Sequence, residues 1–99
     1  MLTMRIIAAV ASLTASICAA PAAPPEPPPG AAACSGCHPA NAGIETPVPR
    51  LAGRNPAEMV QQMQAFRDGQ RDATVMGRIA KGFTDPQIQA IAAWYADQR

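Results

Sequence analysis

The chain has 99 residues, 48% of them hydrophobic and only 4% aromatic, which suits one small domain rather than several. Eight basic and seven acidic residues give a formal net charge of +1, which excludes the basic surplus typical of nucleic-acid-binding proteins. The chain contains three cysteines and one histidine, so any site built from these residue types is small.

Residues 1–22 have the pattern of a secretory signal peptide. After one basic residue, residues 6–20 run without a charged side chain. This stretch is too short to span a bilayer but suits the apolar part of an export signal, with cleavage expected after Ala22. Cys18 offers a lipid-modified cysteine as an alternative, but Ile17 is a poor residue before such a cysteine. We therefore expect a periplasmic protein with no lipid anchor at Cys18 and no membrane span in the mature chain.

Residues 23–30 are expected to form a proline-rich linker and residues 31–99 a domain. Six of the eleven prolines fall in or just before this linker, where they favour an extended, unpacked chain. A domain of this size buries a modest core and often needs a disulfide, a metal or a bulky cofactor. Only Cys34 and Cys37 remain after signal removal, and a disulfide between them would close too small a loop to add much stability. A bulky cofactor is therefore favoured.

The clearest predicted helix spans residues 55–68. Asn55 can cap it, Pro56 suits its first position and Gly69 ends it. Four apolar side chains share or adjoin one face at helical spacing: Met59, Val60, Met63 and Phe66. This face is expected to turn toward the core.

Three further helices complete an all-α prediction. A short one follows Gly30 and ends near Cys37, a second covers residues 75–81, and the last is capped by Thr84 or Asp85. The last helix carries an apolar face made of Ile88, Ile91, Ala92 and Tyr95. No segment alternates convincingly with period two, so we expect no strands.

The run from Cys34 to His38, CSGCH, carries the chemistry. In a C-x-x-C-H motif the two thiols add across the vinyl groups of haem, and the adjacent histidine supplies an axial imidazole nitrogen. The sequence therefore predicts one covalently bound haem c, attached at Cys34 and Cys37 and ligated by His38.

Other uses of this motif fit less well. A zinc site needs four ligands, and the mature chain has no cysteine or histidine beyond Cys34, Cys37 and His38. A thioredoxin-like redox pair needs strands that this sequence does not predict. An inert disulfide would leave the small core without support.

The second axial ligand is expected to be a methionine, because no second histidine is present. Met76 follows a polar turn and precedes Gly77, which makes it the best candidate, whereas Met59 and Met63 suit a helix face. An open sixth position remains the alternative. The carbonyl of Pro49 is a candidate acceptor for the second nitrogen of His38, although Pro49 could simply stiffen its loop.

The segments CSGCH, PRLAGRNPAEMVQQMQAFRDGQR and TVMGRIAKGFTDPQIQAIAAWYADQ together resemble class I c-type cytochromes. They look closest to bacterial periplasmic cytochromes that include the monohaem subunit of flavocytochrome c sulfide dehydrogenase. The resemblance implies a small cytochrome c fold, in which a short N-terminal helix crosses the C-terminal helix and the helices wrap around one haem. It also implies the roles given above to the site residues: Cys34, Cys37, His38, Pro49 and Met76. Pro39 departs from the glycine that usually follows the histidine.

These observations favour an electron carrier rather than an enzyme. Its partners would be redox proteins, among them a flavoprotein subunit if the chain serves a sulfide dehydrogenase. An open-site haem peroxidase or gas sensor is the weaker alternative, because the chain offers no distal histidine. Arg50 and Arg54 are candidate partners for the haem propionates. Four basic residues form a candidate patch for steering an acidic partner: Arg67, Arg71, Arg78 and Lys81.

Overall fold

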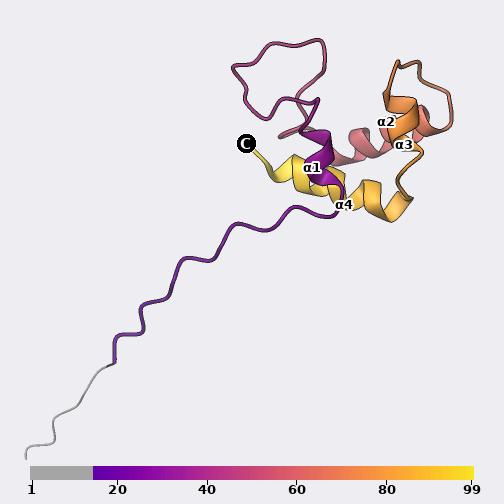
Figure 1. Cartoon of the computed structure of the whole chain (residues 1–99). Coiled ribbons are helices and arrows are strands. Elements are labelled where there is room, and N and C mark those ends of the chain that lie inside the picture. Colours follow the sequence, from indigo (N-terminus) through magenta and orange to yellow (C-terminus); the bar gives the residue numbers. More distant parts are fainter. Residues whose placement is uncertain (1–14) are drawn as a thin grey trace, which may run out of the picture.

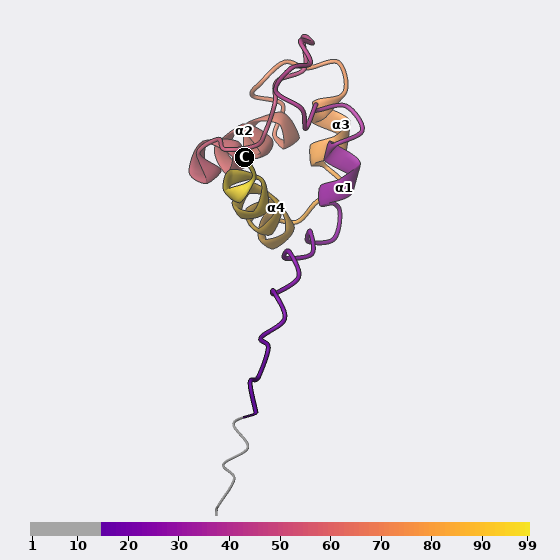
Figure 2. The ribbon, with the colours of Figure 1, turned by 90° about the vertical axis from the view of Figure 1, so that its left-hand side faces the viewer.

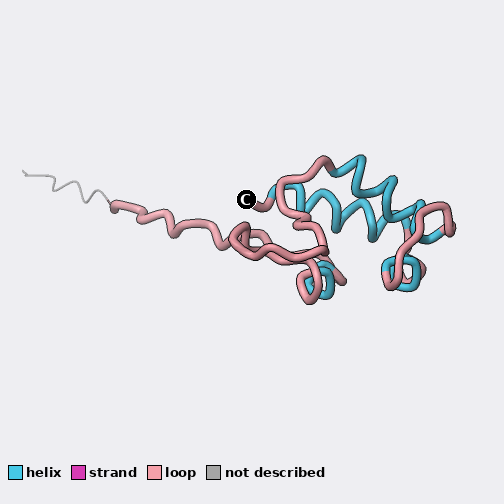
Figure 3. The backbone as a smooth tube through the Cα atoms, turned by 90° about the horizontal axis from the view of Figure 1, so that it is seen from above, coloured by secondary structure: helices cyan, strands magenta, loops and turns pink. Residues whose placement is uncertain are grey.

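The computed structural model describes residues 15–99 (Figure 1). Its helices are α1 (Ala31–Cys34), α2 (Pro56–Arg67), α3 (Met76–Ala80) and α4 (Asp85–Asp97). No strand occurs in the described residues, and Figure 3 shows helices joined by loops. The all-α prediction is confirmed. The first fourteen residues of the predicted signal peptide lie outside the described part of the chain.

Residues 15–28 have no secondary structure and lead away from the helices as an extended segment (Figure 1). Cys18 lies within this segment and is exposed. The extension agrees with the proline content of the segment, because each proline removes a backbone donor and fixes its own φ angle. None of the helices found between residues 15 and 99 has the length and apolarity needed to cross a bilayer.

The start of α2 follows the sequence prediction closely. The Asn55 side-chain oxygen accepts hydrogen bonds from the backbone N–H groups of Ala57 (2.9 Å) and Glu58 (3.2 Å), and Pro56 is the first helical residue. The helix stops just before Gly69, whose φ of 73° lies in the left-handed region that glycine adopts without strain.

The start of α4 resolves the choice between two caps in favour of Thr84. Its hydroxyl accepts from the N–H of Gln87 (3.4 Å), and the Gln87 side-chain oxygen accepts from the N–H of Thr84 (2.9 Å). This reciprocal pair is a capping box. Asp85 is the first helical residue instead of the cap.

Helix α1 ends at Cys34, earlier than the expected end near Cys37. Beyond Cys34 the chain tightens into turns, in which the N–H of Gly36 bonds the carbonyl of Ala33 and the N–H of Cys37 bonds that of Cys34. Gly30 precedes the helix with a φ of 88°. The bonds made by Gly36 and Cys37 join residues three apart, as in a 3₁₀ turn, and the N–H of His38 then reaches the carbonyl of Cys34 four residues back.

The core forms where α1 and α2 meet α4. Helix α2 packs against both α3 and α4, and Figure 2 shows α1, α2, α3 and α4 arranged in a ring around the middle of the domain. One buried cluster joins three helices and consists of Ala31, Met59, Ala92 and Tyr95. The predicted crossing of a short N-terminal helix with the C-terminal helix is therefore present, and the hydroxyl of Tyr95 reaches the carbonyl of Ala31.

This core is small. No large side chain in residues 15–99 is fully buried. On the predicted apolar face of α2, Met59 is buried, but Val60, Met63 and Phe66 are only half-buried. The protein part of the core therefore leaves much apolar surface partly exposed, which is costly for a domain of this size.

Candidate functional site

Residues 34–38 fold into a tight turn, here called the attachment turn. The N–H groups of Cys37 (3.2 Å) and His38 (2.9 Å) both bond the carbonyl of Cys34. The thiols of Cys34, which is half-buried, and Cys37, which is exposed, are both free. The turn therefore brings two thiols and one imidazole together on a single short segment.

The ring of His38 is held from across a loop. Its Nδ1 lies 2.5 Å from the carbonyl oxygen of Pro49. A carbonyl only accepts hydrogen bonds, so Nδ1 carries the proton and donates. In the neutral imidazole this leaves Nε2 with a free lone pair, which is the state in which histidine binds a metal.

The two thiols differ in their surroundings. The Sγ of Cys34, the last residue of α1, lies 3.8 Å from the carbonyl oxygen of Gly30, the residue before that helix. Burial raises the pKa of the Cys34 thiol, and its own backbone opposes that rise only in part. Cys34 also packs at the edge of the core cluster.

Met76 lies on a separate element. It is the first residue of α3, is half-buried, and follows Val75, whose side chain is 53% exposed. The other four candidates belong to the attachment turn and to the loop bonded to it. The structure thus gathers Cys34, Cys37, His38 and Pro49 into one unit, whereas Met76 lies on a separate helix, α3.

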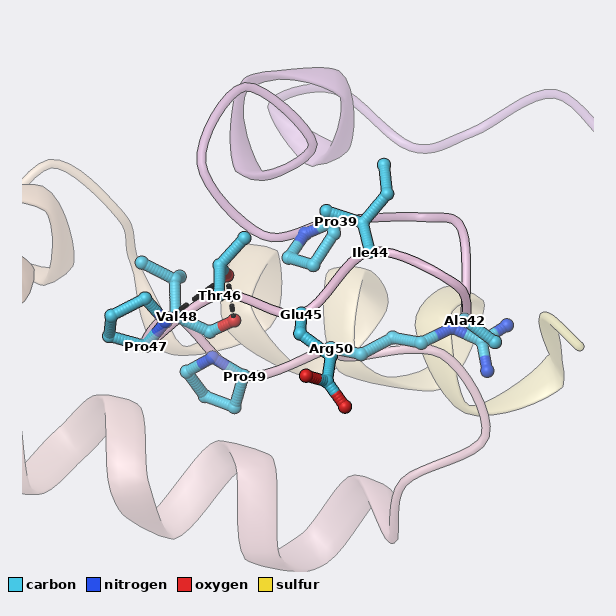
Figure 4. Close-up of a pocket in the computed structure, with 9 residues that line it drawn as sticks. All are labelled: Pro39, Ala42, Ile44, Glu45, Thr46, Pro47, Val48, Pro49 and Arg50. Atoms are coloured by element: carbon cyan, nitrogen blue, oxygen red, sulfur yellow. Dashed lines mark hydrogen bonds between the residues drawn. The ribbon is translucent and has the colours of Figure 1, made fainter.

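The loop between His38 and Leu51 encloses an open hollow of about 500 Å³ (Figure 4). The hydroxyl of Thr46 donates to the carbonyl of Val48 (2.9 Å) and accepts from its N–H (3.2 Å), and Arg50 Nε donates to the carbonyl of Ala40 (3.1 Å). The hollow contains neither thiol nor the imidazole. It is a surface feature of the loop and not the place where the candidate chemistry gathers.

A smaller cavity of about 130 Å³ lies between the attachment turn and the end of α4, and its walls include His38 and Trp94. Beside it, the hydroxyls of Ser35 and Tyr95 are 2.8 Å apart, and Tyr95 donates to the carbonyl of Ala31. The Ser35–Tyr95 contact was not predicted from the sequence. A tyrosine on an otherwise apolar helix face was the available signal, because a buried phenol needs a polar partner.

The described residues fit a haem. Two free thiols and an imidazole with one free nitrogen are the donors that haem c uses. The half-buried apolar side chains would be covered by a flat apolar macrocycle. Trp94 Nε1 is buried without a hydrogen-bond partner among residues 15–99, and an acceptor such as a propionate carboxylate would satisfy it. By contrast, the described residues hold no group of three His, Cys, Asp or Glu side chains arranged for a metal ion.

Comparison with known proteins gives the family. The chain is 34% identical over 64 residues to the cytochrome subunit of sulfide dehydrogenase from Chlorobaculum tepidum, covering 65% of this chain and 58% of that protein. It is 40% identical over 96 residues to a thiosulfate dehydrogenase electron acceptor from Thiomonas intermedia, covering 94% of this chain and 44% of that protein. The chain thus spans about half the length of these two relatives. No protein-family model matches.

A third relative is close to this chain in extent. Cytochrome c-554(548) from Halomonas halodenitrificans is 35% identical over 69 residues, which cover 66% of this chain and 83% of the relative. This match includes most of a complete cytochrome, and the matching chain here is helical and carries the attachment turn. The chain belongs to the class I c-type cytochromes, which carry covalently bound haem c and transfer electrons.

Proposed function

We propose that this chain is a periplasmic monohaem cytochrome that carries single electrons. In this proposal Cys34 and Cys37 would carry the haem c, and His38 and Met76 would ligate its iron. The observation that supports this most strongly is the His38–Pro49 hydrogen bond, which leaves Nε2 free directly after the two free thiols.

The protein residues hold and orient the group. Donation from Nδ1 to Pro49 fixes the ring plane of His38 and leaves Nε2 as the nitrogen that can bind a metal. Backbone hydrogen bonds from Cys37 and His38 to the carbonyl of Cys34 hold the two cysteines and the histidine on one turn, so the same short segment would carry the thioether links and the ligand. Bound haem supplies a one-electron couple between ferric and ferrous iron.

Met76 is the proposed second ligand because the other methionines of the domain have competing positions. Met59 is 6% exposed within the core cluster, and Met63 lies along α2. Met76 instead begins helix α3 after an irregular loop. A thioether ligand would raise the reduction potential relative to a second imidazole.

A second arrangement is an electron-transfer subunit that works with a flavoprotein. It is favoured by one observation, the similarity to a protein named as a cytochrome subunit of sulfide dehydrogenase. Purification from the native cell distinguishes the two arrangements. A free carrier elutes alone, whereas a subunit elutes with a yellow flavin-containing chain.

The test is production of the full chain in a bacterial host that matures c-type cytochromes. We expect periplasmic protein that begins at Ala23, with an intact mass equal to polypeptide plus one haem and a pyridine haemochrome spectrum of two thioether links. The oxidised protein should show a weak sulfur–iron band at the red end of the spectrum, whereas a high-spin spectrum would favour the peroxidase or gas-sensor alternative.

The matched control replaces both Cys34 and Cys37 with serine, and this protein should leave the maturation pathway without haem. Colourless wild-type protein with the mass of bare polypeptide would contradict the proposal.

A further inference from the structure

The phenol of Tyr95 has a fixed set of partners. Tyr95 is 6% exposed, and its hydroxyl lies 2.5 Å from the carbonyl of Ala31 and 2.8 Å from the hydroxyl of Ser35. The Ala31 carbonyl can only accept, so the single phenolic proton goes there. Ser35 must then donate to Tyr95. The two bonds run in one direction, from the attachment turn through Tyr95 to α1.

The backbone of Tyr95 is bonded to a different segment. Its carbonyl accepts from the N–H of Gly53 (3.0 Å) as well as from that of Gln98 (3.1 Å). Gly53 ends the stretch that follows Pro49, and Leu51 within that stretch packs against the core cluster. One residue of α4 therefore reaches the segment before His38 through its side chain and the segment after Pro49 through its backbone.

The loop itself restrains the His38–Pro49 bond through one side-chain contact, from Arg50 Nε to the carbonyl of Ala40 (3.1 Å). Every residue from 40 to 47 is exposed. The ring of Tyr95, in contrast, packs in the core cluster with Met59 and Ala92 and meets Trp94 edge to face, with centroids 4.9 Å apart and planes at 84°. Tyr95 on α4 is therefore the buried end of these contacts, and the loop is the exposed end.

We propose that Tyr95 is the positioning residue that keeps the Nδ1 of His38 on the carbonyl of Pro49. It ties both sides of that hydrogen bond to one buried point on α4, with Ser35 as its contact on the attachment turn. Tyr95 does not touch the iron. Its effect is on the orientation of His38, and the inference rests on the proposed function, in which Nε2 of His38 binds haem iron.

The chain has a single histidine, so its ring proton gives one unambiguous signal in protein labelled with ¹⁵N-histidine. We would measure the solvent-exchange rate of the Nδ1 proton in reduced, haem-loaded wild type, Tyr95→Phe, Ser35→Ala and the double variant. Phenylalanine keeps the ring packing and removes both phenol bonds. We expect exchange about tenfold faster in Tyr95→Phe and about threefold faster in Ser35→Ala, in line with the loss of two bonds and of one.

The double variant should exchange at the rate of Tyr95→Phe, because Ser35 acts through the phenol. Thr84→Val is the control, since it removes a hydroxyl bond at the other end of α4 and lowers stability without touching the attachment turn. Its exchange rate should match wild type. Equal rates in Tyr95→Phe and Thr84→Val would overturn the role of Tyr95.

The haem content of each purified protein shows whether the proposed function has failed or only the proposed role of Tyr95. A wild-type protein without haem contradicts the proposed function and this inference with it, whereas haem-loaded variants with unchanged exchange contradict only the role of Tyr95. If Tyr95→Phe does not mature, Ser35→Ala alone decides, because a wild-type exchange rate in that variant would contradict the contact through Ser35.

Discussion

Replacement of Gly30 with alanine tests how the start of α1, which leads into the attachment turn, packs against the rest of the domain. Gly30 has a φ of +88°, and a Cβ atom there would lie 2.5 Å from Cε1 of Phe83 and 3.5 Å from Cδ1 of Ile91. The left-handed backbone costs alanine about 1–2 kcal/mol. Forcing the Phe83 ring aside costs about 1–3 kcal/mol more. We therefore expect a loss of roughly 2–5 kcal/mol, a large share of the total stability of a small domain.

The measurement is the free energy of unfolding in urea. Far-UV circular dichroism follows the helices, and fluorescence of the single tryptophan, Trp94, follows the core. Gly69→Ala is a matched control, because Gly69 has a φ of +73° but nothing within 4 Å of an added Cβ. The control should lose only the backbone part, about 1–2 kcal/mol. Phe83→Leu should recover part of the loss in Gly30→Ala.

Equal losses in Gly30→Ala and Gly69→Ala would refute this reasoning. In that case Phe83 would not press on Gly30, and the start of α1 would depend on backbone conformation alone. A larger loss in Gly69→Ala would also contradict it, since no atom of the described residues stands near that position.

Three further predictions concern α2, α4 and the second ligand. Asn55→Ala should lower the unfolding free energy by about 1 kcal/mol through loss of the α2 cap, and an unchanged urea midpoint would contradict this. Asp85→Asn should lower Tm in dilute buffer but hardly at 1 M salt, because the exposed Arg67–Asp85 pair (2.7 Å) is screened; a salt-independent difference would exclude an electrostatic cause. Met76→Ala should keep its haem but titrate at a lower reduction potential, with Met63→Ala near wild type; a drop in the Met63 variant instead would assign the ligand there.

The parts of the fold that could be predicted from the sequence are those set by near neighbours in the chain. The Asn55 cap, the proline after it and the regularly spaced apolar residues of α2 all lie within one short stretch of chain. The helix can therefore be predicted without knowledge of the tertiary structure. Gly30 is the opposite case. Its need for glycine comes from Phe83, a residue distant in sequence, and no local pattern reports that contact.

The candidate site divides in the same way. The two thiols and His38 are adjacent in the chain and their motif is specific, and the Pro49 contact was expected from the resemblance. The Ser35–Tyr95 contact depends on how α4 crosses α1, so it could not be predicted from spacing. Met76 as the second ligand stays a prediction, since only its place on α3 is described.

The small core has a consequence for turnover in the cell. The buried hydrophobic residues of the described chain number six: Ala31, Met59, Ala80, Ile88, Ala92 and Tyr95. Proteases cut the open form of a protein in proportion to its population, and a group that binds only the native form lowers that population. A polypeptide that has missed its prosthetic group would therefore be digested first. The protein that remains would be the haem-loaded form, and no separate quality-control factor would be needed to remove the rest.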